Sequence, residues 1–452
     1  MTASILAVVL AAGEGTRMRS SLPKVLHKVG GLPMLGHVLG AVRAAGADKI
    51  ALVVGNGSQT VASTAKSLAP GLDVYVQEER LGTGHAVLAA RAALIDADGD
   101  ILIAYGDTPL VTPGLFKSIL ECLDEGADVS VMGFETGNPK GYGRLIMSGD
   151  RLARIREEKD ASDTERRITF CNSGLMGLKA KHALPLLDAI GNANAKGEYY
   201  LTDIVEIANA RGLVVRAVTG PEEDTLGVNN RAELAKAEAI FQNRKRQAFM
   251  MAGVTLIAPE TVYFAHDTEI GVDCVIEPNC FFAPGVRLES GVHIKANCYL
   301  EGDIGKNLFV SVASGAEIGP YARLRPGADI GEDVKVGNFC EVKNAHVARG
   351  AKINHLTYIG DADLGEYANI GAGTITCNYD GFSKFRTVIG ANAFIGSNSA
   401  LVAPVTIGSG AFVGSGSVIT DDVSENALAV GRGRQVEKAG WASHFRDRNR
   451  KI

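Results

Sequence analysis

The sequence predicts an α/β protein made of a helix-covered, mostly parallel sheet and a parallel β-helix, joined by a linker helix. Three observations carry this prediction. Apolar runs alternate with helical stretches in the first half of the chain, a six-residue apolar period runs through the second half, and glycine is abundant. The 54 glycines among 452 residues are about 12% of the chain, against about 7% in ordinary proteins.

The composition is that of a globular protein. The chain has 46 lysines and arginines, 51 acidic residues, a net charge of −5 and 46% hydrophobic residues, which excludes a disordered chain and argues against a nucleic-acid partner. No apolar run approaches the roughly 20 residues of a membrane span, and the N-terminal run lacks the features of a secretory signal. Seven cysteines without a C-x-x-C pair fit a reducing, cytoplasmic location.

The first part of the chain, residues 1–228, alternates strands with helices. Strands buried on both faces are expected at the apolar runs Ser4–Leu10, Ile50–Val54, Val74–Val76 and Ile101–Tyr105. Proline and glycine positions predict helices over Met34–Ala45, from Pro113, and over Tyr199–Arg211. This alternation is typical of a parallel sheet that binds ligands beyond the C-terminal ends of its strands.

The linker helix is expected over residues 229–250. This segment contains no glycine or proline and is rich in alanine, glutamate, lysine and arginine, which are strong helix formers. Residues 251–452 follow it with a different period.

A six-residue period begins at Ile270. Twelve of the thirteen positions in this frame are large and apolar, Lys306 being the exception: Ile270, Ile276, Phe282, Leu288, Ile294, Leu300, Lys306, Val312, Ile318, Leu324, Ile330, Val336 and Val342. A second set lies four residues later, is mostly small, and includes four cysteines that we interpret as core fillers. One large and one small inward position per hexad predicts a triangular β-helix with three hexads per coil.

The period fails between residues 343 and 388. The step from Val342 to Ile353 is eleven residues instead of twelve, and that from Ile370 to Ile389 is nineteen instead of eighteen. Because departures from a consistent pattern tend to mark functional segments, a site is expected here.

A glycine loop follows the first predicted strand. Gly13 and Gly15 can bring backbone N–H groups close to phosphates, and Arg17 and Lys24 can neutralise a nucleoside triphosphate. The loop is neither a Walker loop nor a full dinucleotide fingerprint, because Met18 stands where a third glycine is needed.

Asp107 follows the strand Ile101–Tyr105. A carboxylate at this position is a candidate Mg²⁺ ligand, since Mg²⁺ takes one or two protein oxygens and completes its shell with phosphate and water. The alternative interpretation is a helix cap ahead of Pro109.

A longer series of motifs resembles the sugar-1-phosphate nucleotidyltransferases. It includes L-A-A-G-E-G-T-R-M at residues 10–18, L-P-K at 22–24, L-G-T-G-H at 81–85, Y-G-D at 105–107, N-S-G at 172–174 and G-V-N-N at 227–230. The resemblance implies a Rossmann-like domain in which UTP and the nucleotide sugar contact Leu10, Ala11, Ala12, Gly13, Lys24, Gln77, Gly82, Thr83, Gly143, Glu157, Asn172 and Asn229. It also implies that Arg17 stabilises the phosphorus under attack and that Asp107 and Asn229 bind Mg²⁺.

His355 lies where the hexad period fails, ahead of the run G-A-G-T-I-T-C-N-Y-D-G at residues 371–381. Histidine titrates near working pH and suits a general base, although a structural histidine is the alternative interpretation.

Together with H-L-T-Y-I-G-D at residues 355–361 and N-A-L-A at 426–429, these motifs resemble the bifunctional bacterial N-acetylglucosamine-1-phosphate uridyltransferase / glucosamine-1-phosphate acetyltransferase family over almost the whole chain. That family makes UDP-N-acetylglucosamine for peptidoglycan and lipopolysaccharide. The resemblance implies a left-handed β-helix of hexapeptide repeats, a homotrimer with the acetyl site between chains, and His355 as the base that deprotonates the attacking amine.

The same resemblance assigns the remaining site residues. Glucosamine-1-phosphate would contact Arg325, Lys343, Tyr358 and Asn369, and acetyl-CoA would contact Ala372, Asn378, Tyr379, Ser397, Ser415 and Arg432. Arg434 is an alternative to Arg432. Asn354 and Ser415 depart from the glycine and alanine familiar in relatives.

Three functions remain open at this point. The first is the two-reaction enzyme, and the second is a single-activity sugar-1-phosphate nucleotidyltransferase whose β-helix only forms trimers. The third is a hexapeptide scaffold with a degenerate nucleotide domain. His355 with Asn378 and Tyr379 separates the first from the second, and Arg17, Lys24 and Asp107 argue against the third.

Overall fold

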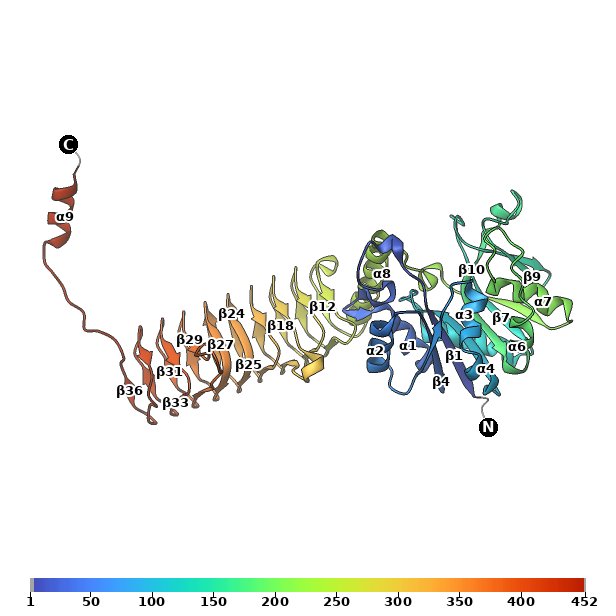
Figure 1. The fold of residues 1–452 in the computed structure, drawn as a ribbon. Coiled ribbons are helices and arrows are strands. Elements are labelled where there is room, and N and C mark those ends of the chain that lie inside the picture. Colours follow the sequence, from blue (N-terminus) through green and yellow to red (C-terminus); the bar gives the residue numbers. More distant parts are fainter. Residues whose placement is uncertain (1–3, 451–452) are drawn as a thin grey trace. The chain divides into compact units, whose positions relative to one another are not determined.

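The computed structural model describes residues 4–450, and the chain divides into two compact units, residues 1–244 and 245–452. The helix α8 (Arg231–Met251) contains the boundary between them, and it confirms the predicted linker helix. Figure 1 shows a sheet with helices in the first unit and a stack of short strands in the second. No helix within residues 4–450 is long and apolar enough to cross a membrane.

The sheet of the first unit is mixed, with the strand order β11-β7-β10-β6-β1-β4-β5. The four predicted strands are confirmed as parallel neighbours: β1 (Ile5–Ala11), β4 (Lys49–Gly55), β5 (Asp73–Gln77) and β6 (Asp100–Tyr105). The others are β7 (Val129–Glu135), β8 (Arg144–Ser148), β9 (Arg151–Arg156), β10 (Phe170–Lys179) and β11 (Val215–Thr219). Strand β10 runs antiparallel to both β6 and β7, so the sheet is only mostly parallel.

Helices cover both faces of this sheet. In β1, Leu6 and Val8 point into one core, while Ala7 and Val9 point into the other, which explains the unbroken apolar run. The first core also contains residues of α3 (Thr83–Ala89), α4 (Arg91–Ile95), α6 (Ala180–Leu187) and α7 (Ile204–Ala210). The second contains residues of α1 (Met34–Ala44), α2 (Gln59–Leu68) and α5 (Pro113–Asp124).

The helix expected over residues 199–211 begins later than predicted. A 3₁₀ turn occupies Leu201–Asp203 and α7 starts at Ile204. Tyr199 is instead extended, since its N–H donates to Leu81 and its carbonyl accepts from the N–H of Gly84, at 2.7 and 2.9 Å. These two hydrogen bonds fix the loop before α3 and override the local helical preference.

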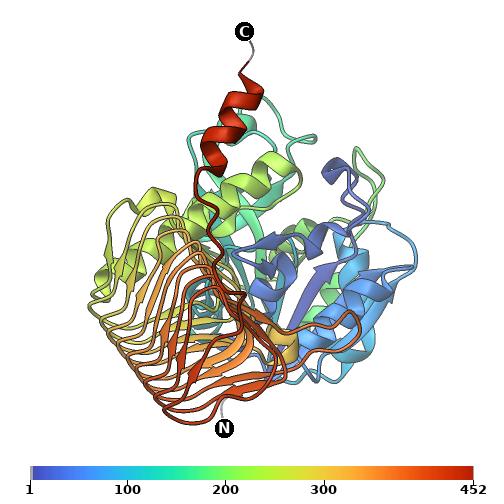
Figure 2. The ribbon, with the colours of Figure 1, turned by 90° about the vertical axis from the view of Figure 1, so that its left-hand side faces the viewer.

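The second unit is a left-handed parallel β-helix whose coils stack on one another (Figure 2). One face, here face 1, is a sheet of β12 (Thr255–Leu256), β15 (Val275–Ile276), β18 (His293–Ile294), β21 (Glu317–Ile318), β24 (Lys335–Asn338), β26 (Lys352–His355), β28 (Asn369–Ile370), β31 (Phe394–Ile395), β34 (Phe412–Val413) and β36 (Leu428–Ala429).

Face 2 stacks β13 (Tyr263–Phe264), β16 (Phe281–Phe282), β19 (Tyr299–Leu300), β22 (Arg323–Leu324), the first part of β25 (Glu341–Val347) and of β27 (Tyr358–Leu364), β29 (Ile375–Cys377), β32 (Ala400–Val402) and β35 (Val418–Ile419). Face 3 stacks β14 (Glu269–Ile270), β17 (Val286–Leu288), β20 (Val310–Val312), β23 (Ala328–Ile330), the last parts of β25 and β27, β30 (Thr387–Ile389) and β33 (Val405–Ile407).

Both inward sets of the hexad pattern are buried along most of the stack. Phe282, Leu300 and Leu324 are fully buried, as are the small-position residues Cys274 and Val334. All seven cysteines are free, so the core needs no disulfide.

The prediction was wrong at Ile304 and Lys306, which were assigned to the repeating frame. Ile304 is 46% exposed, and residues 303–308 form an outward loop closed by pairing of Asp303 with Leu308. Strand pairing places Arg287 beside Ser311, a coil of 24 residues instead of the usual 18. The loop adds six residues, which is the length of one hexad. The six-residue period of the sequence therefore continues through it, and the period alone cannot reveal the loop.

Coil lengths also explain the later failure of the period. Pairing of Lys335 with Lys352 and of Lys352 with Asn369 gives two coils of 17 residues, and pairing of Asn369 with Phe394 gives one of 25. After this, Phe394 pairs with Phe412 at the regular 18.

We predict that deleting Asp303–Leu308 leaves the β-helix intact. The N–H groups of Gly302 and Val310 donate to the consecutive carbonyls of Pro284 and Gly285, both at 2.9 Å, so Gly302 and Phe309 can be joined. The midpoint of thermal unfolding, followed by circular dichroism, should change by no more than about 3 °C. Deleting Ser311 instead removes a residue from within the strand Val310–Val312, so one of its two inward valines turns outward. That variant should melt at least about 10 °C lower, and equal midpoints for both deletions would contradict this account.

Candidate active sites

A cavity of about 270 Å³ lies where the parallel strands of the first unit end. Eight residues assigned to nucleotide binding line it, together with the assigned metal ligand Asp107: Leu10, Ala11, Ala12, Gly13, Lys24, Gln77, Gly82 and Thr83. They lie at the C-terminal ends of β1 and β5 and in the segments that follow β1, β5 and β6. The parallel register brings these strand ends together, because Leu10 pairs with both Val53 and Tyr105.

The glycine loop wraps closely around Lys24. Gly15 has φ +66°, and a Cβ there would lie 2.5 Å from the Cβ of Lys24. Any other residue would therefore push Lys24 away from the cavity. The loop ends in a 3₁₀ turn over Thr16–Met18 that carries Arg17.

Four polar side chains converge beside the cavity. The Lys24 ammonium pairs with the carboxylate of Asp107 and donates to Asn229 Oδ1 at 3.3 Å, and Arg17 donates to the same amide oxygen at 3.0 Å. The backbone N–H of Val228 donates to the carbonyl of Asp107 at 2.9 Å. Residues more than 200 positions apart are thus held together by the cations of Lys24 and Arg17.

The oxygens of Asp107 and Asn229 suit a divalent metal ion. They are hard donors that already converge on a cation, and no cluster of three or more histidine, cysteine or acidic residues exists among residues 4–450. A site of two protein oxygens completed by phosphate and water is the kind that Mg²⁺ prefers.

Gln77 and Gly82 form another wall of the cavity. Gln77 is only 4% exposed, and its amide nitrogen donates to the carbonyl of Gly82 at 3.2 Å and lies 3.2 Å from Nδ1 of His85. Gly82 has φ +116°, and a Cβ there would lie 2.6 Å from the carbonyl oxygen of Tyr199. Gln77 is thus held by two polar contacts, and Gly82 packs against Tyr199 too closely for any side chain.

Gly143, Glu157 and Asn172 lie together but do not line this cavity. The N–H of Asn172 donates to the carbonyl of Gly143 at 2.8 Å, and the hydroxyl of Thr202 donates to Glu157 Oε1 at 3.3 Å. A Cβ on Gly143 would lie 3.6 Å from that same oxygen. Burial raises the pKa of the Glu157 carboxyl, and burial also raises the pKa of the nearby Tyr105 phenol.

The sequence reasoning gave no role to five residues that line the cavity, the apolar Val25 and Ala86 and the polar Arg80, Tyr105 and Glu198. Arg80 donates through Nε to the carbonyl of Ala12 at 3.0 Å and pairs with Glu14 of the glycine loop. Arg80 could have been found from its position, because it follows the predicted strand Val74–Val76. The loops that follow parallel strands meet at the C-terminal edge of the sheet, where ligands bind.

In the second unit, several predicted residues stack along one corner of the β-helix. Strand pairing on face 1 places His355, Ala372, Ser397 and Ser415 at equivalent positions of four successive coils, and Asn338 one coil before them. Arg432 donates to the carbonyl of Ser415 at 2.9 Å and so extends this row, which we call the corner row. At about 4.8 Å per coil, the row from His355 is roughly 19 Å long.

His355 is exposed, and its Nδ1 lies 3.2 Å from the Oδ1 of Asn338. Because that amide oxygen can only accept, the contact favours the neutral tautomer with its proton on Nδ1, which leaves Nε2 free to accept a proton. The ring is therefore oriented for proton uptake through Nε2. The sequence reasoning missed Asn338, because finding it requires the 17-residue length of this coil.

Arg325 and Lys343 are stacked on face 2, since Leu324 pairs with Val342. Arg325 donates to Glu341 at 2.8 Å, and Lys343 lies 3.5 Å from Asp361. Tyr358 follows on the next coil, opposite Glu341, and its hydroxyl lies over Gly360, where a Cβ would collide with it. Asn369 is separate from this group, because it pairs with Lys352 on face 1, three residues before His355.

Two further groups approach Lys343. Burial together with the neighbouring ammonium of Lys384 lowers the pKa of Lys343. Asp361 is 7% exposed, accepts from Asn344 and Asn378, and keeps a lowered pKa through those hydrogen bonds and the two lysines, although burial opposes this. Tyr379 and Lys384 belong to the outward loop of the 25-residue coil and pair with each other. The sequence reasoning did not single out Asp361 or Lys384.

Sequence comparisons agree with this division. The MobA-like NTP transferase domain matches residues 7–170, the hexapeptide repeat of succinyl-transferase matches residues 267–301, and the bacterial transferase hexapeptide (six repeats) matches residues 386–421.

Curated relatives match nearly the whole chain. "Bifunctional protein GlmU" of Chelativorans sp. is 60% identical over 98% of this chain and 96% of its own length. The protein of the same name from Azorhizobium caulinodans is 57% identical over 98% and 97%, and that from Agrobacterium fabrum is 55% identical over 99% and 97%.

We predict that Asp203→Asn stabilises the first unit at neutral and alkaline pH only. Burial, with the carboxylates of Glu206 and Glu157 nearby, raises the pKa of Asp203 to about 6. A raised native pKa contributes stability below the unfolded value of about 4, and this stability is lost as pH rises through 6. Asparagine mimics the protonated form, so at pH 8 it should add roughly 1 kcal/mol after allowance for solvent screening.

The measurement is urea unfolding followed by circular dichroism at 222 nm, which reports the helices of the first unit. Repeating it at pH 4.5 supplies the control, because most of the gain should then disappear. A gain of equal size at both pH values would rule out the linkage to Asp203.

Proposed function

The chain belongs to the family of bifunctional GlmU proteins, and on that premise we propose which of its residues carry each reaction. The protein is a nucleotidyltransferase and an acetyltransferase of UDP-N-acetylglucosamine synthesis. It acetylates glucosamine-1-phosphate with acetyl-CoA and then transfers UMP from UTP to the product, releasing pyrophosphate. The observation that carries this reading is that one chain holds both sets of residues, at a strand-end cavity and along the corner row.

In the uridyltransferase reaction, a phosphate oxygen of N-acetylglucosamine-1-phosphate attacks the α-phosphorus of UTP. The new P–O bond forms as the bond to the pyrophosphate oxygen breaks. We assign Lys24 and Arg17 to neutralising the phosphates, because both converge on Asn229 beside the cavity. A divalent metal bound at Asp107 and Asn229 adds further positive charge, and we propose that it is Mg²⁺.

The two ends of the nucleotide sugar are assigned to different walls. Gln77, Gly82 and Thr83 hold the uracil, while Leu10, Ala11, Ala12 and Gly13 offer backbone groups to the rest of UTP. Gly143, Glu157 and Asn172 hold the sugar. The protein needs no covalent nucleophile here, since positioning and charge neutralisation supply the catalysis.

In the acetyltransferase reaction, His355 Nε2 takes a proton from the amine of glucosamine-1-phosphate as the nitrogen attacks the thioester carbonyl. The C–N bond forms, the C–S bond breaks, and coenzyme A leaves as the thiol once its sulfur receives a proton. Asn338 orients the ring. Arg325, Lys343, Tyr358 and Asn369 hold the sugar phosphate. Acetyl-CoA is held by Ala372, Ser397, Ser415 and Arg432 of the corner row, together with Asn378 and Tyr379 from the 25-residue coil.

We also propose that the protein is a homotrimer and works in the cytoplasm. Hexapeptide repeats favour oligomers, and Asn369 lies on a different face from Arg325, Lys343 and Tyr358. A site shared between copies reconciles these positions, because one copy can supply face 1 and another face 2. UTP, acetyl-CoA and seven free cysteines fit a reducing compartment.

We predict that the two activities separate by mutation. His355→Ala should lower acetyl transfer by at least about 10³-fold and leave UMP transfer within about twofold. Asp107→Ala should do the reverse, because it removes a proposed metal ligand from the other unit. The assay contains glucosamine-1-phosphate, acetyl-CoA, UTP and Mg²⁺, with each omitted in turn and products identified by mass spectrometry. Loss of both activities in either folded variant would defeat the division.

We predict a trimer by light scattering, and dissociation should abolish acetyl transfer while sparing UMP transfer. Dilution of the enzyme followed by both assays tests this. A monomer that still acetylates glucosamine-1-phosphate would refute the shared site.

A further inference from the structure

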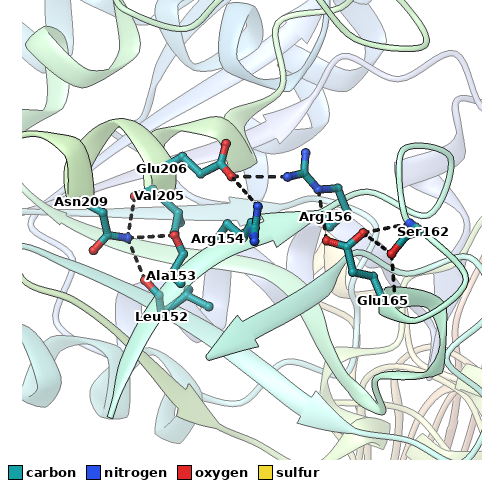
Figure 3. Close-up of polar contacts among 9 residues, drawn as sticks. All are labelled: Leu152, Ala153, Arg154, Arg156, Ser162, Glu165, Val205, Glu206 and Asn209. Carbon is teal, nitrogen blue, oxygen red and sulfur yellow. Dashed lines mark hydrogen bonds and ion pairs between the residues drawn. The ribbon is translucent and has the colours of Figure 1, made fainter. Parts of the chain in front are cut away.

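The edge strand β9 is fastened to helix α7 by side chains from both elements (Figure 3). Asn209 of α7 donates its amide to the carbonyls of Leu152 and Ala153, at 2.8 and 3.0 Å, and to that of Val205 at 3.0 Å. Among the strands of residues 4–450, β9 pairs only with β8, so these hydrogen bonds satisfy carbonyls on its open edge. The helix therefore acts as the second neighbour of the strand.

Two arginines of β9 reach the same carboxylate of α7 but differ in what else they hold. Arg154 lies 3.9 Å from Glu206 and is 45% exposed. Arg156 lies 3.4 Å from Glu206 and 3.7 Å from Glu165, and is 30% exposed. Only Arg156 thus joins three segments, β9, α7 and the 3₁₀ turn Glu165–Arg167.

Glu165 is itself fixed by the start of its loop. Its carboxylate accepts from the N–H of Ser162 at 2.8 Å and from the hydroxyl of Ser162 at 2.9 Å, and these bonds lower its pKa. It stays an anion at working pH and a dependable partner for Arg156. The loop of residues 157–167 is therefore tied at its far end to the last residue of β9.

Glu157 is the first residue of that loop. Its carboxylate accepts from Thr202, which precedes α7 by two residues. The Glu157–Thr202 contact can persist only while β9 and α7 stay side by side. Arg156, adjacent to Glu157 in the chain, holds both neighbours in place.

Arg156 also contributes a positive charge among several carboxylates. Glu157, Asp160, Glu198, Asp203 and Glu206 act on one another as like charges, while Arg156 is a cation that opposes the charge of Asp203. Removing Arg156 takes away a cation that opposes Asp203 and Glu206, whereas Lys196 continues to oppose Glu157. We therefore expect the loss of Arg156 to weaken binding of the sugar phosphate and not of UTP.

We propose that Arg156 is a positioning residue for the sugar phosphate of the uridyltransferase reaction. By holding Glu206 and Glu165 together it fixes the Glu157–Thr202 pair, and it takes no part in binding UTP. This inference rests on the proposed role of Glu157 in holding the sugar. None of the residues assigned to the uridyltransferase site lies on β9 (Arg151–Arg156).

The test compares Arg156→Ala with Arg154→Ala, a matched pair on one strand with one shared partner. For UMP transfer, Arg156→Ala should raise the KM for N-acetylglucosamine-1-phosphate about tenfold and leave the KM for UTP within about twofold. Arg154→Ala should leave both within about twofold, as expected of an exposed pair. Arg156→Lys should recover part of the loss, because it keeps the charge but reaches only one carboxylate.

Glu165→Gln and Glu206→Gln should each give a smaller rise, and the double variant should resemble Arg156→Ala. Equal kinetics for Arg156→Ala and Arg154→Ala would overturn the proposal. So would an equal rise in both KM values, since that indicates general loosening.

Hydrogen exchange separates this inference from the proposed function. Amides of residues 157–167 should exchange faster in Arg156→Ala and not in Arg154→Ala, whichever sugar the enzyme uses. If the wild type transfers no UMP to this sugar, the proposed function fails while exchange still tests the fastening. If hydrogen exchange is unchanged in both variants, Arg156 does not hold the loop of residues 157–167 in place.

Discussion

In-register pairing of parallel strands is the constraint on which both candidate sites depend. In the first unit it aligns the ends of β1, β4, β5 and β6, so that the glycine loop, Gln77 and Asp107 leave the sheet at one edge. In the second unit it aligns each coil with the next, so that His355 and Ala372, 17 residues apart, share one corner. The same backbone hydrogen bonds therefore convert sequence separation into proximity in both folds.

Each candidate site also pairs a lysine with a carboxylate. Lys24 pairs with Asp107, and Lys343 with Asp361, and each of these side chains is less than one-fifth exposed. A buried cation without a partner would tend to lose its proton. In the proposed mechanism the carboxylates hold the two ammonium groups in place, so that an arriving phosphate meets a charge that is already positioned.

The sequence predicted those features that repeat or that are buried on all sides. The continuous apolar runs of β1 and β6 and the hexads of the β-helix fall in this class, because burial leaves a period in the sequence. The five strands β7 to β11 were not predicted. Strand β9 lies at an edge and buries only Leu152 and Ile155 between arginines, whereas β7 is almost wholly buried and was overlooked despite its apolar run. The loop 303–308 was missed because its length equals the period. Asn338, Arg156 and Lys384 could not be found, as their partners depend on coil lengths and on helix–strand docking.

The failure of the hexad period can be traced to one corner of the β-helix. In regular coils a gap separates the strands of faces 2 and 3, as between β22 and β23, whereas β25 and β27 run through the corner without a break. Each of these coils has lost one corner residue, and Asn344 and Asp361 take the turn with φ of 45° and 49°.

Asp361 then hydrogen-bonds to Asn344 and Asn378, one 17-residue coil away on either side. Such a buried polar stack needs coils of equal, shortened length, because a single extra residue would separate the donors from the carboxylate. The stack holds Lys343, and the long coil that follows supplies the loop of Tyr379 and Lys384. The irregular spacing in the sequence is therefore the direct result of building a polar corner into an apolar solenoid.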